Sequence, residues 1–135
     1  MLKIEEVIYC ISKIYPDARA GKDFWVVEPL NEDYTQKSDA VLIDWKFSQP
    51  EPTQEQINAV WSKDESEYRQ EVALREATTL QKQKIDDATA LVESAIDQGD
   101  AEKEKIARAY RQALRDVSAQ PGFSAKIIWP DVPKL

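Results

Sequence analysis

The sequence predicts an α+β protein: a small unit of an N-terminal helix plus an antiparallel β-hairpin, followed by a long helical hairpin and a short apolar C-terminal tail. Three observations predict this class. Apolar residues recur at helical spacing at the N-terminus, two short β-prone segments follow, and residues 63–98 contain neither Gly nor Pro. We therefore expect a small α+β domain at 1–62, a helical hairpin at 63–118 and an apolar tail at 119–135.

The first helix is predicted from one apolar face. Pro16 should end it near Tyr15, because the residue before a proline avoids the α-helical region. Charged residues occupy much of the opposite side, so the helix is suited to lie on a sheet. The apolar residues that recur at spacings of three and four are Leu2, Ile4, Val7, Ile8, Ile11 and Ile14.

Two strands are predicted at about 23–28 and 40–47, where aromatic and β-branched residues are dense. The polar segment 29–39 between them is short for a parallel crossover, so we expect antiparallel pairing. The second strand alternates between two faces, and we expect its fully apolar face to cover the first helix. That face comprises Val41, Ile43, Trp45 and Phe47.

Local signals set the ends of the later helices. Thr53 and Gln56 have the spacing of a capping box, which begins a helix. Gly99 suits the left-handed stop of a helix, and Asp100 suits the N-cap of the next one.

The apolar stripe of the predicted helical hairpin is narrow. The two arms should lie antiparallel, and they bury the stripe either within one chain or against a partner, including further copies of the chain. The apolar residues of the first arm are Tyr68, Val72, Leu80, Ile85, Leu91, Val92 and Ile96, and those of the second are Ile106, Ala109, Tyr110, Ala113, Leu114 and Val117.

Charge and composition exclude several partner classes. The net charge is −7, from 25 acidic and 18 basic residues, so the basic field that binds a phosphate backbone is missing and we expect no nucleic-acid partner. No apolar run approaches the roughly 18 residues of a membrane helix, so we expect no membrane partner. A single cysteine, Cys10, permits no intrachain disulfide and fits a reducing cytoplasm.

Residues suited to catalysis or metal binding are scarce. The chain has no histidine and only three well-separated glycines, so we expect no metal, no cofactor, no catalytic residues and no enzymatic activity. The carboxylates nearest to aromatic residues are Asp23, Glu28 and Asp44, and we expect Asp44 to face solvent. Cys10 is expected to be a buried, inert thiol.

The aromatic residues fall into two groups. Those of the N-terminal part should form its core, whereas Trp129 lies in a terminal segment flanked by proline. This segment either folds back on its own chain or docks on another protein, and we predict partner binding by Phe123, Ile127, Ile128, Trp129 and Pro130. The expected core aromatics are Trp25, Trp45, Phe47 and Trp61.

Two stretches resemble known families. IYCISKIYPDARAGKDFWVV, followed by AVLIDWKFSQPEPTQEQINAVW, resembles the small XkdW-like proteins of phage tail operons. The segment Tyr110–Leu135 resembles the C-terminal sequence of phage tail-fibre assembly proteins, through YRQALRDV, QPGF and IIWP.

The resemblance implies a non-enzymatic protein that helps a β-rich, trimeric tail-fibre protein to fold, trimerise or attach in the host cytoplasm. Three functions remain open at this point. The chain is an assembly chaperone, a structural tail-fibre or adaptor subunit that stays in the virion, or an enzyme acting on cell-surface glycan, which would need two positioned carboxylates.

Overall fold

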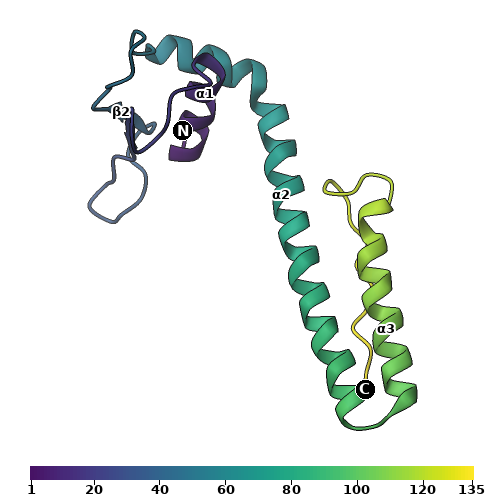
Figure 1. Ribbon diagram of the computed structural model, residues 1–135. Helices are drawn as coiled ribbons and strands as arrows, with labels where there is room; N and C mark the ends of the chain where they lie inside the picture. The colour runs from purple at the N-terminus through teal and green to yellow at the C-terminus, as the bar shows by residue number, and fades with distance from the viewer. The chain divides into compact units, whose positions relative to one another are not determined.

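The computed structural model describes all 135 residues, which form two compact units, Met1–Tyr68 and Arg69–Leu135 (Figure 1). The predicted fold class is confirmed: a small helix and an antiparallel hairpin precede a long and a shorter helix. The 44-residue helix α2 contributes to both units. The elements in order are α1 (Ile4–Ile14), β1 (Trp25–Val27), β2 (Val41–Ile43), α2 (Gln54–Asp97), α3 (Ala101–Asp116) and the 3-10 turn η1 (Val117–Ala119).

Helix α1 begins and ends where local chemistry predicts. The Lys3 N–H donates to the Glu6 carboxylate at 3.2 Å, which satisfies a free donor at the N-terminus of the helix. At the other end Tyr15 leaves the helical conformation and its N–H donates to the Ile11 carbonyl at 2.7 Å. The predicted stop before Pro16 is confirmed.

The two strands pair antiparallel, as predicted, but each is only three residues long. Val26 pairs with Leu42, and both side chains pack against the core. The flanking pairs, Trp25 with Ile43 and Val27 with Val41, project to the opposite face because successive strand residues alternate in direction.

The prediction that Val41, Ile43, Trp45 and Phe47 form one inner face of the second strand is wrong. Val41 and Ile43 are exposed, whereas Trp45 and Phe47 pack against the core. The cause is Asp44, whose φ of 50° ends the strand and reverses the inward and outward alternation beyond it. Asp44 itself faces solvent, as predicted.

The core of the N-terminal unit lies between α1, the hairpin and the first part of α2. Phe24, Ile11 and Val7 are fully buried there, with Ile57 supplied by α2. The capping box at the start of α2 is confirmed, because the Thr53 N–H donates to Gln56 Oε1 and the Gln56 N–H donates to Thr53 Oγ1.

Three of the four expected core aromatics take part in this core. Trp45, Phe47 and Trp61 pack against it, and the rings of Trp45 and Phe24 lie 5.6 Å apart between centroids. Trp25 does not, because its position in β1 directs it to the outer face of the hairpin. There the Lys46 ammonium lies 5.1 Å from its ring centroid.

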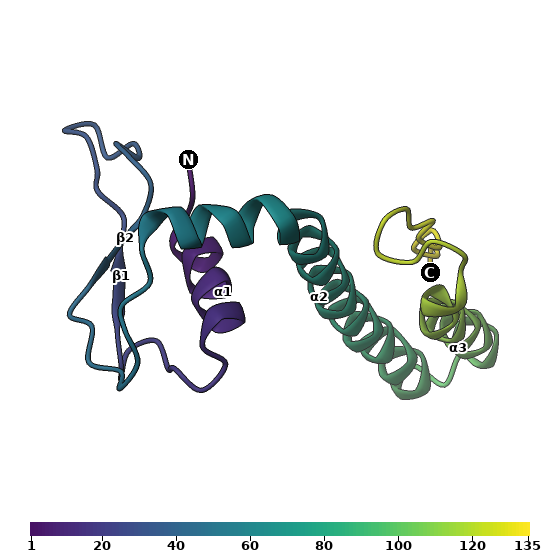
Figure 2. The ribbon, with the colours of Figure 1, turned by 90° about the horizontal axis from the view of Figure 1, so that it is seen from above.

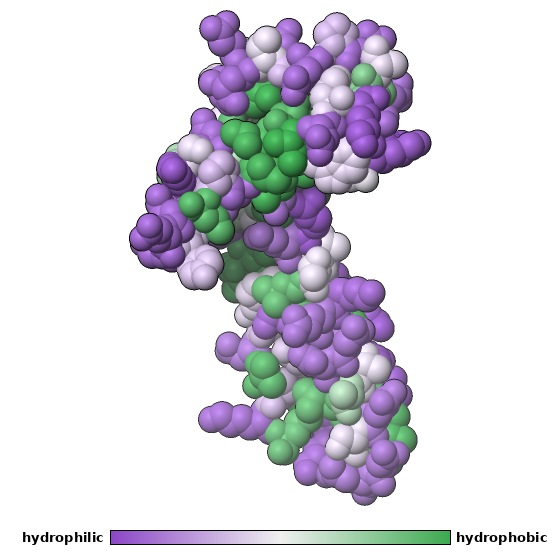
Figure 3. Space-filling view, turned by 90° about the vertical axis from the view of Figure 1, so that its left-hand side faces the viewer, coloured by the Kyte–Doolittle hydropathy of each residue, from purple (hydrophilic) through white to green (hydrophobic).

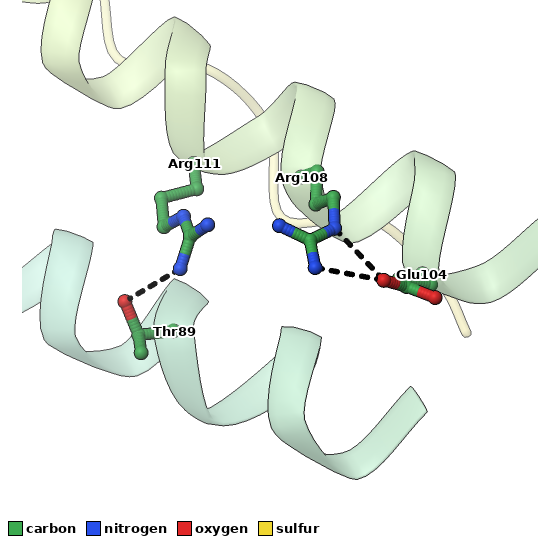
Figure 4. A network of polar contacts seen from close by, with 4 residues as sticks. All are labelled: Thr89, Glu104, Arg108 and Arg111. Carbon is green, nitrogen blue, oxygen red and sulfur yellow. Dashed lines mark hydrogen bonds and ion pairs between the residues drawn. The ribbon is translucent and has the colours of Figure 1, made fainter. Parts of the chain in front are cut away.

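In the second unit, α3 packs antiparallel on α2. Gln81 Nε2 donates to the Leu114 carbonyl at 2.9 Å, and Arg111 donates to Thr89 Oγ1 at 3.3 Å (Figure 4). The break between the helices follows the sequence prediction. Gly99 is left-handed with φ 66°, and Asp100 caps α3 by accepting from the Lys103 N–H.

The contact between these helices includes part of the predicted stripe, because Val92, Tyr110, Leu114 and Val117 are buried, but it departs from the stripe elsewhere. Leu80, Ile96 and Ile106 are exposed, and α2 instead presents small buried alanines at helical spacing. Alanine is a strong helix former that signals no particular face, so the larger side chains misled the prediction. The buried residues are Ala77, Ala88, Val92 and Ala95 of α2, Ala107, Tyr110 and Leu114 of α3, and Val117 of η1.

The left-handed backbone at Asp44 yields a stability prediction. Asp44→Val should lower the free energy of unfolding by about 1–2 kcal/mol, because a β-branched residue is strained at positive φ. Asp44→Asn should be nearly neutral, because asparagine tolerates this conformation. Urea unfolding followed by tryptophan fluorescence measures both, and equal stabilities would contradict the assigned role of Asp44.

Candidate partner-binding site

The predicted partner-binding residues lie in the segment after η1. The chain turns at 120–126, where Gly122 and Ser124 have φ of 74° and 78°, and continues without regular structure to Leu135. Figure 1 shows this segment, in yellow, running back beside α2 and α3 towards the turn that joins them. The tail therefore folds back onto its own unit.

A side-chain clasp closes the loop at the start of the tail. Gln120 Nε2 donates to the Ile128 carbonyl at 2.8 Å, and the Ile128 N–H donates to Gln120 Oε1 at 3.1 Å. The amide thus pairs with both backbone groups of Ile128, as a neighbouring strand would. It fixes the local backbone and leaves the Ile128 side chain 72% exposed.

In contrast to Ile128, Trp129 packs against the helices of its own unit. It packs against a cluster of Ala88, Tyr110 and Leu114, and the Lys84 ammonium lies 5.3 Å from the centroid of its ring. Trp129 is therefore packed on its own unit and stays half-buried. Its packing positions the exposed Ile128 beside it.

The predicted site residues therefore differ in accessibility. Ile128 is exposed, while Phe123, Ile127, Trp129 and Pro130 are half-buried. Sequence reasoning missed Gln120 and Lys84, which hold the segment in place. No pattern in the sequence marks them, because a glutamine eight residues before its partner and a lysine on a distant helix are unremarkable by themselves.

The acidic residues form no metal-binding cluster. No three His, Cys, Asp or Glu residues gather to hold a metal ion. Of the carboxylates considered from the sequence, Asp23 accepts from the Arg19 N–H at 2.8 Å and so stabilises a turn, and Asp44 lies exposed after β2. None of the helices is both long enough and apolar enough to span a membrane.

The single thiol is buried, as predicted. Cys10 is fully buried in the core of the N-terminal unit. Burial is the main cause that raises the pKa of its thiol from 9.0 to about 11, and the negative charges of Asp64 and Glu6 contribute to the same shift. The neutral thiol is therefore the form present at neutral pH.

Two family models match the chain, one on each unit. Residues 7–69 match the family described as XkdW protein, and residues 75–134 match the family described as phage tail assembly chaperone protein. The matches support a phage tail assembly protein. The recognition made from the sequence is confirmed. No curated protein and no solved structure matches the chain.

The matched ranges contain the motifs from which the resemblance was drawn. The second match begins at residue 75 and so includes much of α2 as well as the tail. The clasp and the exposed Ile128 lie inside the range that matches tail assembly chaperones.

The clasp yields a prediction about the mobility of the loop. Gln120→Ala removes two hydrogen bonds worth roughly 1 kcal/mol each, so cleavage by trypsin after the exposed Lys126 should accelerate roughly 5- to 30-fold. Mass spectrometry of timed digests follows this one bond. Gln112→Ala, which removes a glutamine contact within α3, is the matched control and should leave the rate unchanged.

The buried thiol yields a prediction about reactivity and pH. Iodoacetamide at pH 8 should modify Cys10 only after unfolding, because the thiolate is the reactive form. A matched control is the double variant Cys10→Ala/Ser12→Cys, whose thiol sits on an exposed position of the same helix and should react in the native state. Rapid native labelling of Cys10 would contradict its burial.

The raised pKa also sets the sign of a stability change. A thiol whose pKa is higher in the folded than in the unfolded protein contributes to stability, and this contribution is complete at pH values below the pKa of the unfolded state. This contribution should be lost as the pH rises from about 9 to about 11. Urea titrations of wild type and Cys10→Ala across this interval measure the difference.

Proposed function

We propose that the protein is a tail-fibre assembly chaperone, which binds the fibre protein in the host cytoplasm and aids its folding, trimerisation or attachment. The observation that carries the proposal is the clasped loop: an isoleucine is held exposed by its neighbours within the range that matches tail assembly chaperones. A solvent-exposed apolar side chain on a fixed backbone costs little entropy when it binds, which favours a role as a contact.

The physical need for such a partner follows from the expected client. Long β-rich trimers fold slowly and expose strand edges and apolar surface before they assemble. A small acidic protein that covers part of this surface lowers the chance of aggregation until the trimer closes. This role requires binding and release, and no bond-making chemistry, so the proposal is of a non-enzymatic protein.

The proposed contact comprises Ile128 together with the half-buried tail residues Phe123, Ile127, Trp129 and Pro130. Ile128 supplies the most exposed side chain of this contact. Gln120 lies outside the contact and holds the backbone of Ile128, and the packing of Trp129 on its own unit supports the same arrangement.

A structural role in the virion is the second candidate. Exposed apolar residues of the helical unit, including Leu74, Leu80, Ile96 and Ile106, favour contacts with other chains, either copies of this one or a fibre subunit. Such contacts would keep the protein in the particle in fixed copy number.

The two candidates are separated by mass spectrometry of purified particles beside co-expression with the tail-fibre protein of the same phage. A chaperone should be absent from particles and should raise the soluble yield of the fibre protein. Stoichiometric presence in particles would favour the structural role. Absence from particles with no effect on the fibre protein would contradict both.

The exposed isoleucine yields the mutational test. Ile128→Ser should weaken binding of the purified fibre protein about tenfold or more, because an apolar side chain of this size contributes that much when buried. The melting temperature should stay unchanged, since Ile128 makes no core contact. Val132→Ser, which alters another exposed tail residue outside the proposed contact, is the matched control. If calorimetry gives the same affinity for wild type, Ile128→Ser and Val132→Ser, Ile128 is not part of the interface.

A further inference from the structure

The β-hairpin has apolar side chains on both faces. Val26 and Leu42 face the core, while Trp25 and Val27 pair across the strands with Ile43 and Val41 on the other side. We call the side chains of Trp25, Val27, Val41 and Ile43 the outer hairpin face. Val27 is 40% exposed, and Val41 and Ile43 are each 38% exposed. Half-exposed β-branched residues in adjacent cross-strand pairs form one continuous apolar surface.

Only one side of the hairpin is covered within the N-terminal unit. Figure 2 shows α1 and the start of α2 on the same side of β1 and β2. Figure 3, which faces the side where β2 lies, shows a hydrophobic patch on this unit. Strands that are apolar on both faces are typical of sheets buried between two layers. The outer hairpin face therefore has the composition of a buried surface and lacks its second layer.

The charge of the unit indicates what kind of layer fits. Residues 1–68 contain 14 acidic and seven basic residues, which gives −7, whereas residues 69–135 contain 11 of each, which gives zero. The whole net charge of the protein thus belongs to the unit that carries the outer hairpin face. A second copy would bring an equal negative charge to the contact, and a partner with basic residues would be attracted.

The backbone of the face indicates the shape of that layer. β-branched side chains on a short pleated sheet pack well against a second sheet about 10 Å away. Lys46 already contacts the ring of Trp25, so Val27, Val41 and Ile43 are the side chains left to be covered.

We infer that the outer hairpin face binds a β-strand segment of the tail-fibre protein that is apolar towards the hairpin and flanked by Lys or Arg. The identity of this partner rests on the proposed function, but the face is separate from the tail contact at Ile128. The protein then holds its client through two surfaces, one on each unit, and two linked contacts bind more tightly than either does alone.

The test compares wild type with Val41→Thr/Ile43→Thr in binding to the purified tail-fibre protein by calorimetry. Threonine keeps the β-branched shape, and its hydroxyl opposes burial against an apolar segment. We expect affinity to fall about tenfold or more, with Tm within about 3 °C of wild type. Val132→Thr makes the same β-branched exchange at an exposed tail residue outside both proposed contacts and is the matched control, with no loss expected.

Salt tests the charge of the partner. Wild-type affinity should decline between 0.05 and 0.5 M salt as screening shortens the range of electrostatic attraction from more than ~10 Å to a few ångströms. An affinity that rises or stays constant with salt would overturn the basic character of the segment.

Each remaining outcome is decisive. If the hairpin variant binds like wild type while Ile128→Ser binds weakly, the inference is overturned and the proposed function stands. If wild type binds no fibre protein, the proposed function and this assignment both fail. Two results would give the face another occupant and overturn the inference. If light scattering shows that wild type is a dimer and the hairpin variant is a monomer, the outer hairpin face binds a second copy of the chain. If the hairpin variant lowers Tm by more than about 3 °C, the face is covered by the chain itself.

Discussion

The left-handed backbone at Asp44 is the constraint on which the N-terminal unit depends. A strand that continued regularly from Val41 would place Val41, Ile43, Trp45 and Phe47 on one face. The positive φ at Asp44 instead sends Trp45 and Phe47 into the core beside Phe24 and Tyr15. It leaves Val41 and Ile43 outside. The local break thus determines both the aromatic core and the composition of the outer hairpin face.

The aromatic residues around this break also hold the connection to α2. Trp45 Nε1 donates to the Gln49 carbonyl at 2.7 Å, and the Tyr15 hydroxyl donates to the Pro50 carbonyl at 2.8 Å. These bonds satisfy backbone groups of a proline-containing segment that forms no regular structure. The start of α2 is therefore fixed relative to α1, and Ile57 reaches the core.

The helical unit is built on a different principle. Its helices meet through small alanines, through a few larger side chains such as Leu114 and Tyr110, and through polar contacts such as that of Arg111 with Thr89. The tail adds a third layer, since Trp129 covers the small side chain of Ala88 and packs beside Tyr110 and Leu114. Of the two alternatives for this segment, the structure shows it folded back on its own unit, with Ile128 left exposed.

Signals carried by single residues and their near neighbours were readable from the sequence alone. They include the stop at Pro16, the Thr53–Gln56 capping box, the left-handed Gly99, the Asp100 cap and the antiparallel hairpin, each of which depends on local conformational preference or on a short loop. The relationship to phage tail assembly proteins was likewise legible in the motifs of both halves.

Tertiary structure decided which apolar side chains are covered. The sequence shows that Val41, Ile43, Leu80, Ile96 and Ile106 are apolar, and helical or strand periodicity assigned them to buried faces. Only the folded structure shows that the backbone at Asp44 reverses the inward and outward alternation of side chains, and that alanines take the place of Leu80 and Ile96 in the helix contact. The exposure of Ile128 beside a buried Trp129 likewise arises from contacts with Gln120 and with distant helices, which no local pattern encodes.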